Sequence, residues 1–265
     1  GFELPTEPFG GAEQLDWAPD SRHIAYSCRK KTGIEYAFST NTSIYIYDVL
    51  TGEEIAVTET GGYDTDPVWS PDGSHIAWIS MERDGYEADR QRLFTADVIW
   101  EEPAEDGQSF GLRVENIREL ASSLDADVAG IAWTDDGSSI IFPAVVDAVQ
   151  ALFSVNVDDN APIVQRLTSE DWWFGFDKPF GIKRTEEGLT LLTTYQSNLF
   201  PSEIVKVTVP DNGKPAYEPL SHENDAYFAQ VGKVRQEKVM VKCADGSDML
   251  CWVLYPPQFD ANKTW

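Results

Sequence analysis

The sequence contains few of the residues that usually mark a metal or redox site. It has only three histidines and three cysteines among 265 residues. Cys28, Cys243 and Cys251 form no C-x-x-C pair and no spacing that is typical of zinc ligands. We therefore expect neither a metal nor a cofactor, and the cysteines leave the redox compartment open.

Basic residues and long apolar runs are also scarce. Twenty Lys and Arg stand against 45 Asp and Glu, which gives a formal net charge of −25. Such a surface repels phosphate groups, so we expect no nucleic acid and no acidic membrane as a partner. No segment reaches about 18 consecutive apolar residues, so no transmembrane helix is predicted. The acidic surface either keeps the protein in solution or includes a cleft that attracts cationic groups, such as the free amine of a peptide.

What the chain does contain is a repeated turn-and-strand motif. Residues 69–78 read W-S-P-D-G-S-H-I-A-W, in which Pro71 suits the second position of a turn and Gly73 tolerates a positive φ. Residues 75–80 follow as H-I-A-W-I-S, a short apolar run between two polar residues, which is typical of a strand. Related segments occur at 15–26, at 131–142 and, in degenerate form, at 182–192.

Each copy of the motif is followed by a polar loop, a second strand, a turn and a last short strand. Four antiparallel strands in a unit of about 50 residues form a β-propeller blade. The sequence therefore predicts an all-β protein with an incomplete propeller of about four four-stranded blades, at about 12–58, 64–120, 127–168 and 172–220. A β-sandwich is the competing architecture, but it does not explain the internal repeat. The partial propeller is predicted over residues 1–225, and a D-G hairpin at 239–255 falls in a separate segment, 226–265.

Together these motifs resemble a family of serine peptidases. The W-S-P-D-G-x-x-I-A-W repeats are similar to the blades of the prolyl oligopeptidase family and to those of TolB. The hairpin at 239–255, followed by Y-P-P-Q-F at 255–259, resembles the first strands of the α/β-hydrolase domain that follows such a propeller in the peptidases. Segments 28–33, 39–41 and 81–87 look like bacterial dipeptidyl-peptidase V and its acylaminoacyl-peptidase relatives.

The resemblance implies a propeller fragment that carries no part of the catalytic triad. The family's propeller has seven or eight blades, and its nucleophile lies in G-x-S-x-G. That pattern occurs here only as G-Q-S-F-G at 107–111, within an acidic insertion at 100–113 that is expected to be a solvated loop. The chain is therefore expected to begin within the propeller and to end just inside the hydrolase domain. His23 and His75 occupy equivalent repeat positions and are expected on the surface. His222 has no nucleophile motif near it.

In the resembled enzymes, propeller loops limit access to the active site and supply acidic groups that hold the ammonium group of the peptide. The corresponding loops here are 29–41 and 81–92. We expect Glu82, Asp84 and Glu87 to bind the substrate ammonium, with Arg83 and Tyr86 beside them in the substrate-binding loop. The alternative is that these charges form a solvated loop or ion pairs between blades.

The predicted function is thus the non-catalytic propeller portion of a dipeptidyl-peptidase-like serine exopeptidase. A TolB-like binding propeller and the propeller of an acylaminoacyl-peptidase are the alternatives. The expected partners are a peptide substrate and the α/β-hydrolase domain, together with a second copy of the chain if exposed blade faces pair. The expected location is the periplasm or outside the cell, and otherwise the cytoplasm.

Overall fold

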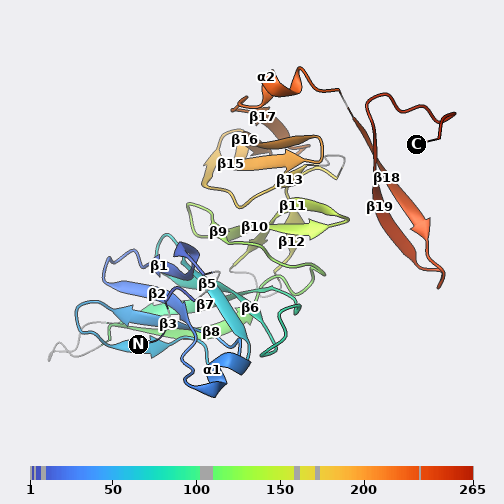
Figure 1. The fold of residues 1–265 in the computed structure, drawn as a ribbon. Helices are drawn as coiled ribbons and strands as arrows, with labels where there is room; N and C mark the ends of the chain where they lie inside the picture. Colours follow the sequence, from blue (N-terminus) through green and yellow to red (C-terminus); the bar gives the residue numbers. More distant parts are fainter. Residues whose placement is uncertain are drawn as a thin grey trace.

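The computed structural model describes residues 2, 4–6, 10–101, 110–157, 162–170, 174–232 and 234–264. Within these residues, antiparallel strands form four successive sheets and a separate hairpin (Figure 1). The all-β prediction, with propeller-like units of about four strands, is confirmed. The first two sheets are β1(Leu15–Trp17), β2(His23–Cys28), β3(Ser43–Asp48) and β4(Glu54–Ala56), then β5(Tyr63–Trp69), β6(His75–Met81), β7(Arg92–Trp100) and β8(Leu112–Glu119).

The other two sheets follow in the same order along the chain. The fourth has an additional strand, because β13 and β14 both pair with β15. Their strands are β9(Ala132–Trp133), β10(Ser139–Val146), β11(Val149–Asn156) and β12(Val164–Arg166), then β13(Gly175–Phe176), β14(Gly181–Thr185), β15(Gly188–Ser197), β16(Phe200–Val209) and β17(Ala216–Pro219).

The repeated motif forms the turn between the first two strands of a blade, as the sequence predicts. Gly73 has a φ of 72° and its N–H donates to the Ser70 carbonyl at 2.9 Å. The Asp72 carboxylate accepts hydrogen bonds from the Ser70 hydroxyl and the Ser74 N–H, at 2.7 and 3.0 Å. The turn is thus closed by its own side chains, which explains why the short motif recurs with the same shape.

Successive blades pack face to face through apolar side chains. Ile44 and Ile46 of the first blade meet Trp69, Ile76 and Trp78 of the second in one buried cluster. Equivalent clusters join the second blade to the third and the third to the fourth. Because every interior blade needs a neighbour on both faces, burial of these faces holds the array together.

Polar bonds near the inner strands fix the spacing of the blades. The Trp69 N–H donates to Asp16 Oδ2 at 2.8 Å, from the second blade to the first. The Trp133 indole donates to the Val68 carbonyl at 3.2 Å, and the Gln150 amide donates to the Phe176 carbonyl at 2.9 Å. Each pair of neighbouring blades thus has a polar bond of this kind, although the donor and acceptor groups differ.

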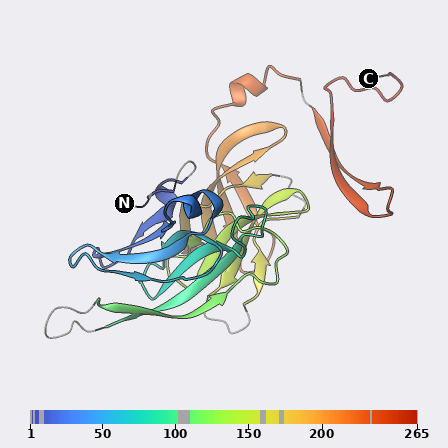
Figure 2. The ribbon, with the colours of Figure 1, turned by 60° about the horizontal axis from the view of Figure 1, so that its bottom comes forward.

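The remaining elements are short or lie apart from the four sheets. A 3₁₀ turn η1(Ala12–Gln14) precedes β1, α1(Ile34–Phe38) follows β2, and α2(Asp225–Phe228) follows β17. The hairpin of β18(Arg235–Lys242) and β19(Asp248–Tyr255) extends away from the sheets in both views (Figure 1, Figure 2). Its Trp252 indole donates to the Ala148 carbonyl at 3.2 Å, at the β10–β11 turn. Across the described ranges, no helix combines the length and the apolar character needed to cross a membrane.

The expectation that both repeat-position histidines lie on the surface is wrong for His23, which is 1% exposed. His23 Nδ1 lies 2.6 Å from Asp20 Oδ2, and its Nε2 lies 3.0 Å from the Phe110 carbonyl oxygen. The rings of Trp100 and Phe110 contact the imidazole. The longer β7–β8 hairpin of the second blade therefore covers a position that the repeat pattern alone places at the surface. His75 is half-buried.

Candidate functional site

The two loops predicted as the functional surface lie against each other at one end of the first two blades. The first carries α1, at the bottom of Figure 1, and the second follows β6. Asp84 joins them: its carboxylate accepts hydrogen bonds from the Ser39 hydroxyl at 2.7 Å and from the Thr40 and Asn41 N–H groups at 2.7 and 3.1 Å. Asp84 therefore holds the two loops together, and an incoming ammonium group would have to share its oxygens with these donors.

Arg83 and Tyr86 form a second structure within the same loop. Arg83 Nη2 and Nε lie 2.9 and 3.2 Å from the two carboxylate oxygens of Asp89, and the guanidinium lies 4.0 Å from the centre of the Tyr86 ring. Hydrogen bonding from Arg83 lowers the pKa of Asp89 to about 2. The predicted role of Arg83 beside the substrate thus competes with a clamp inside the loop, although its side chain is 61% exposed.

Glu82 and Glu87 are the more accessible of the predicted carboxylates. Both residues are exposed, and the Glu82 side chain retains 73% of its surface. Glu82 Oε2 lies 3.7 Å from Arg92 Nη1. The structure therefore places all five predicted residues on one loop but gives them different partners.

A cavity of about 340 Å³ opens beside this loop, between the first and second blades. Its lining includes Asp64, Ser80 and Arg92, none of which the sequence analysis selected as a site residue. Asp64 pairs with Ser80, and Ser80 pairs with Arg92, so the three occupy directly opposed positions on β5, β6 and β7. Directly opposed residues of antiparallel strands project from the same face of a sheet. Only the strand register reveals this row.

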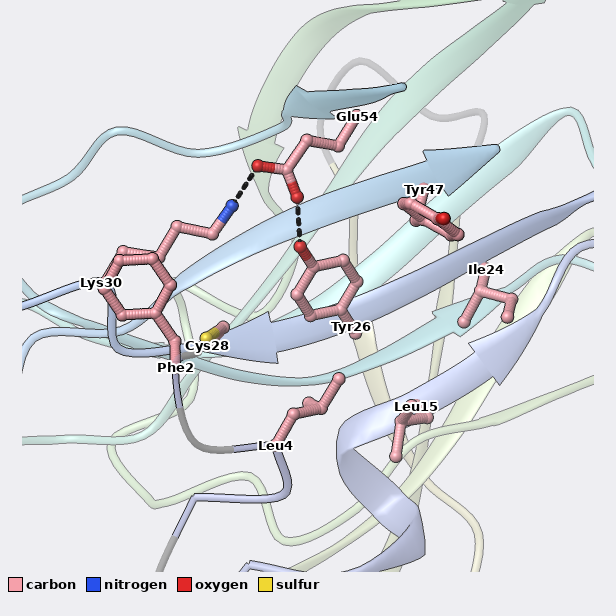
Figure 3. Close-up of a pocket in the computed structure, with 9 residues that line it drawn as sticks. All are labelled: Phe2, Leu4, Leu15, Ile24, Tyr26, Cys28, Lys30, Tyr47 and Glu54. Atoms are coloured by element: carbon pink, nitrogen blue, oxygen red, sulfur yellow. Dashed lines mark hydrogen bonds and ion pairs between the residues drawn. The ribbon is translucent and has the colours of Figure 1, made fainter. Parts of the chain in front are cut away.

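A second pocket, of about 430 Å³, lies on the free face of the first blade (Figure 3). It is mainly apolar, with Leu4 and Leu15 at its side. Within it, Glu54 accepts a hydrogen bond from the Tyr26 hydroxyl and forms an ion pair with Lys30 (Figure 3). Burial and then the bond to Glu54 raise the pKa of Tyr26 above its usual range. Lys30 and then Tyr26 lower the pKa of Glu54. The charges therefore satisfy one another, and the pocket presents apolar surface.

A serine does meet a histidine in the second blade, but not in a catalytic arrangement. Ser74 Oγ lies 2.8 Å from His75 Nδ1, and His75 Nε2 lies 3.4 Å from an Asp97 oxygen. However, Ser74 Oγ is also within 2.9 Å of both oxygens of Asp72, which fix it in the turn. A general base must be free to take the proton of its nucleophile, and this hydroxyl already has a carboxylate acceptor.

His222 lies at a third pocket, of about 670 Å³, beside the fourth blade and α2. His222 Nδ1 lies 3.1 Å from Asp225 Oδ2, and both side chains are exposed. The neighbouring Ser221 hydroxyl donates to Glu203, not to His222, and its oxygen accepts from the Ile204 N–H at 2.8 Å. Hydrogen bonds from Ser221 and Asn224 lower the pKa of Glu203 to about 2. Ser221 is thus a structural group. In the part of the chain that the structure describes, no group of three or more His, Cys, Asp and Glu side chains is arranged to hold a metal ion.

Comparisons of the sequence and the structure with known proteins show what the chain is similar to. No protein-family model matches the sequence. The chain is 35% identical over 265 residues to dipeptidyl-peptidase 5 of Porphyromonas gingivalis, and 37% identical over 266 residues to dipeptidyl-peptidase 5 of Porphyromonas endodontalis. Over its whole length, this chain is similar to dipeptidyl-peptidase 5. The alignments cover 100% of the chain and 35% of each relative, so it spans about a third of their length.

A solved prolyl endopeptidase gives the corresponding result for the fold. Its TM-score is 0.54 at 13% identity, and the match covers 94% of this chain and 33% of that one. At this identity the likeness concerns the fold alone, and it agrees with the propeller-like sheets. The resemblance to the prolyl oligopeptidase family and its dipeptidyl-peptidase branch is confirmed.

Proposed function

We propose that the chain is the non-catalytic propeller portion of a dipeptidyl-peptidase-like serine exopeptidase. In this role it limits access to the active site and helps to recognise the N-terminus of the peptide. The observation that carries the proposal is the 35–37% identity to dipeptidyl-peptidase 5 along the entire chain. The one match to G-x-S-x-G, at 107–111, stands in the sequence between the strands β7 and β8, whereas the nucleophile motif of an α/β-hydrolase joins a strand to a helix, which supports a non-catalytic role.

The exposed carboxylates of the second blade support the recognition step. Glu82 and Glu87 are accessible on a loop that Asp84 ties to the first blade and that Arg83 and Asp89 stiffen. A loop held in one shape presents its exposed carboxylates with little further loss of conformational entropy when a ligand binds. An ammonium group is the natural partner of such a carboxylate.

The proposal is tested by kinetics in a protein that carries this propeller together with its catalytic domain. Glu82→Gln should raise KM for dipeptidyl substrates with a free amine by about two- to fivefold, because an exposed ion pair contributes up to about 1 kcal/mol. The matched control is Glu186→Gln, which neutralises an exposed carboxylate at the β14–β15 turn. An unchanged KM for Glu82→Gln, or cleavage of N-acetylated substrates in preference to free-amine ones, would overturn the proposal. The second outcome would favour an acylaminoacyl-peptidase.

The free face of the first blade supports a further partner. Leu15 and Tyr47 line the apolar pocket of Figure 3, and both they and Trp17 of β1 are more than one third exposed. We propose that the chain covers this face by associating with another blade, either of the same protein or of a second copy. Light scattering on this chain should then show dimers or larger species, and a monomer at high concentration would contradict the second possibility.

A further inference from the structure

The sequence contains a single Asn–Gly step, Asn212–Gly213, in the connection from β16 to β17. Residues 211–214 are all exposed there, and none of them belongs to a strand pair. In such a step the glycine has no side chain that would shield its backbone nitrogen from the side-chain carbonyl carbon of the asparagine. The connection therefore contains two groups that can react with each other.

Neither of these two groups is held by a hydrogen bond. Among the described residues, the Asn212 side-chain amide has no partner, and the Gly213 N–H has no acceptor. The φ of Gly213 is 121°, and the nearest atom to a Cβ built on it would be Pro210 Cγ, at 3.6 Å. The neighbouring Asp211, by contrast, accepts a hydrogen bond from Arg184 at 2.8 Å. The attacking nitrogen and the amide carbon are thus uncovered within an otherwise anchored turn.

Other asparagines in the described part of the chain are protected. The Asn41 amide donates hydrogen bonds to backbone carbonyls of the 60–62 segment, at 3.0 and 2.6 Å. Asn198 is exposed, but a bulky Leu199 follows it, and the Leu199 N–H donates to Ser197 Oγ at 3.0 Å. Exposure alone therefore does not make an asparagine of this chain reactive, whereas Asn212 combines exposure with an uncovered glycine nitrogen.

Asp–Gly steps can react in the same way, but the four in the described residues are closed. Each glycine N–H donates a hydrogen bond of 2.8–3.0 Å: Gly73 to the Ser70 carbonyl, Gly85 to the Thr40 hydroxyl, Gly137 to the Thr134 carbonyl and Gly246 to the Cys243 carbonyl. An aspartate must also be protonated before its oxygen can leave as water. Hydrogen bonding, first of all from the Ser74 N–H, lowers the pKa of Asp72 to about 2, so this carboxyl stays ionised.

We propose that Asn212 is a modification site at which the folded chain deamidates without an enzyme. The Gly213 nitrogen loses its proton and attacks Asn212 Cγ, so that a new C–N bond forms and ammonia leaves with that proton. A five-membered succinimide remains. Water then adds to one of its two carbonyl carbons and opens the ring to aspartate or isoaspartate. One water is consumed, one ammonia is released, and no atom is oxidised or reduced.

The product adds a charge to the surface and leaves the sheet in place. A carboxylate replaces a neutral amide, so the formal net charge changes from −25 to −26. The new carboxylate stands next to Asp211, in the turn to which Arg184 is paired. Isoaspartate also adds one carbon to the backbone, but the pairing of β16 with β17 begins only at Thr208 and Ala216, outside the step. The modification does not rest on the proposed function.

The proposal is tested by peptide mapping with mass spectrometry after incubation of the 265-residue chain at pH 7.4 and 37 °C. The peptide with Asn212 should gain about 1 Da and separate into aspartate and isoaspartate forms. The peptide with Asn198 should react at least tenfold more slowly. The rate at Asn212 should rise with pH, because the attacking nitrogen must lose its proton. Equal rates at the two asparagines, or aspartate without isoaspartate, would overturn the proposal.

Asn212→Gln is the matched control. It keeps an amide in the same turn, but its ring closure gives a six-membered ring and is slower, so this peptide should stay unmodified over the same time. Gly213→Ala is less suitable, because alanine rarely adopts a φ of 121°. An equal mass gain in Asn212→Gln would show that the reaction takes place elsewhere in the peptide and would contradict the assignment.

Incubation in urea separates the effect of the fold from that of the sequence. Asn212 should react in the folded chain at a rate within about threefold of the unfolded chain, because the turn does not cover it. The steps at Asp72 and Asp136 should react at least tenfold more slowly in the folded chain. A folded rate at Asn212 more than tenfold below the unfolded rate would show that the turn protects it, and the proposal would fail.

Discussion

The Asp48 carboxylate offers a sharp test of what holds the first blade together. It is 0% exposed and accepts hydrogen bonds from Arg22 Nε at 2.9 Å and from Arg22 Nη2. It also accepts from the Leu50 N–H at 2.8 Å and from the Thr51 hydroxyl at 2.9 Å. One buried carboxylate thus closes the β3–β4 turn and neutralises a guanidinium. Asp48→Asn removes the charge but keeps the size of the side chain.

The expected loss follows from these contacts. Removing one partner of a buried ion pair costs about 3–5 kcal/mol, and a hydrogen bond to a charged group contributes about 1.5–3 kcal/mol. Arg22 is 26% exposed and can recover some hydration, and Asn retains one acceptor oxygen, so we expect about 3 kcal/mol. At about 2–4 °C per kcal/mol for a chain of this size, the melting temperature should fall by about 6–12 °C.

The effect should depend on pH with a defined sign. Hydrogen bonding to Arg22 is the main cause that holds the pKa of Asp48 far below its usual range. A carboxyl whose pKa is lower in the folded state contributes stability that is complete above its unfolded pKa, about 4, and is lost as pH falls through the folded value. Circular-dichroism melts at pH 7 should therefore separate the wild type and Asp48→Asn fully, and melts near pH 2 should separate them less. A shift below about 2 °C at pH 7, or an equal shift at both pH values, would refute this account.

Two further substitutions test the inner strand of the second blade and the connection that leads to it. Burial raises the pKa of Asp66, whose φ is 53°, so its ionised form destabilises the fold at neutral pH. Asn tolerates this φ, so Asp66→Asn removes the charge without straining the backbone. It should raise the melting temperature by about 2–4 °C at pH 7, with no gain once the pH lies below the pKa of Asp66 in both the folded and the unfolded state. A lower melting temperature at pH 7 would contradict this. Gly62→Ala should cost about 1–3 kcal/mol in denaturant unfolding, because its Cβ would lie 1.9 Å from the Met81 carbonyl oxygen. Gly61→Ala is its control, and equal stability of the two variants would argue against the close approach.

The blade architecture was predictable because its signals are local. The turn at Gly73 is closed by Ser70, Asp72 and Ser74, all within five residues, so a short motif contains the whole turn. The apolar run that forms β6 directly after it is also a local signal. Four copies of such a signal are sufficient to indicate a repeat fold, and together with the hairpin at 239–255 they indicated the resemblance to the peptidases.

The surroundings of individual side chains were not predictable, because their partners are distant in the chain. His23 is covered by Phe110, which is 87 residues away, in a β7–β8 hairpin that is longer than its equivalents in the other blades. Asp84 was selected as an accessible carboxylate, yet its donors lie 43–45 residues earlier, at the end of the α1 loop. A charge-rich loop thus indicates where polar groups gather, but not which of them remain available to a ligand.

The row of Asp64, Ser80 and Arg92 shows why the strands and not only the loops must be considered. Each residue comes from a different strand, and a register shift of one residue on β6 would turn Ser80 to the other face of the sheet. Glu82 continues from β6 to the rim of the same cavity. A residue selected from loop composition, Glu82, therefore shares its cavity with groups that only the strand register identifies.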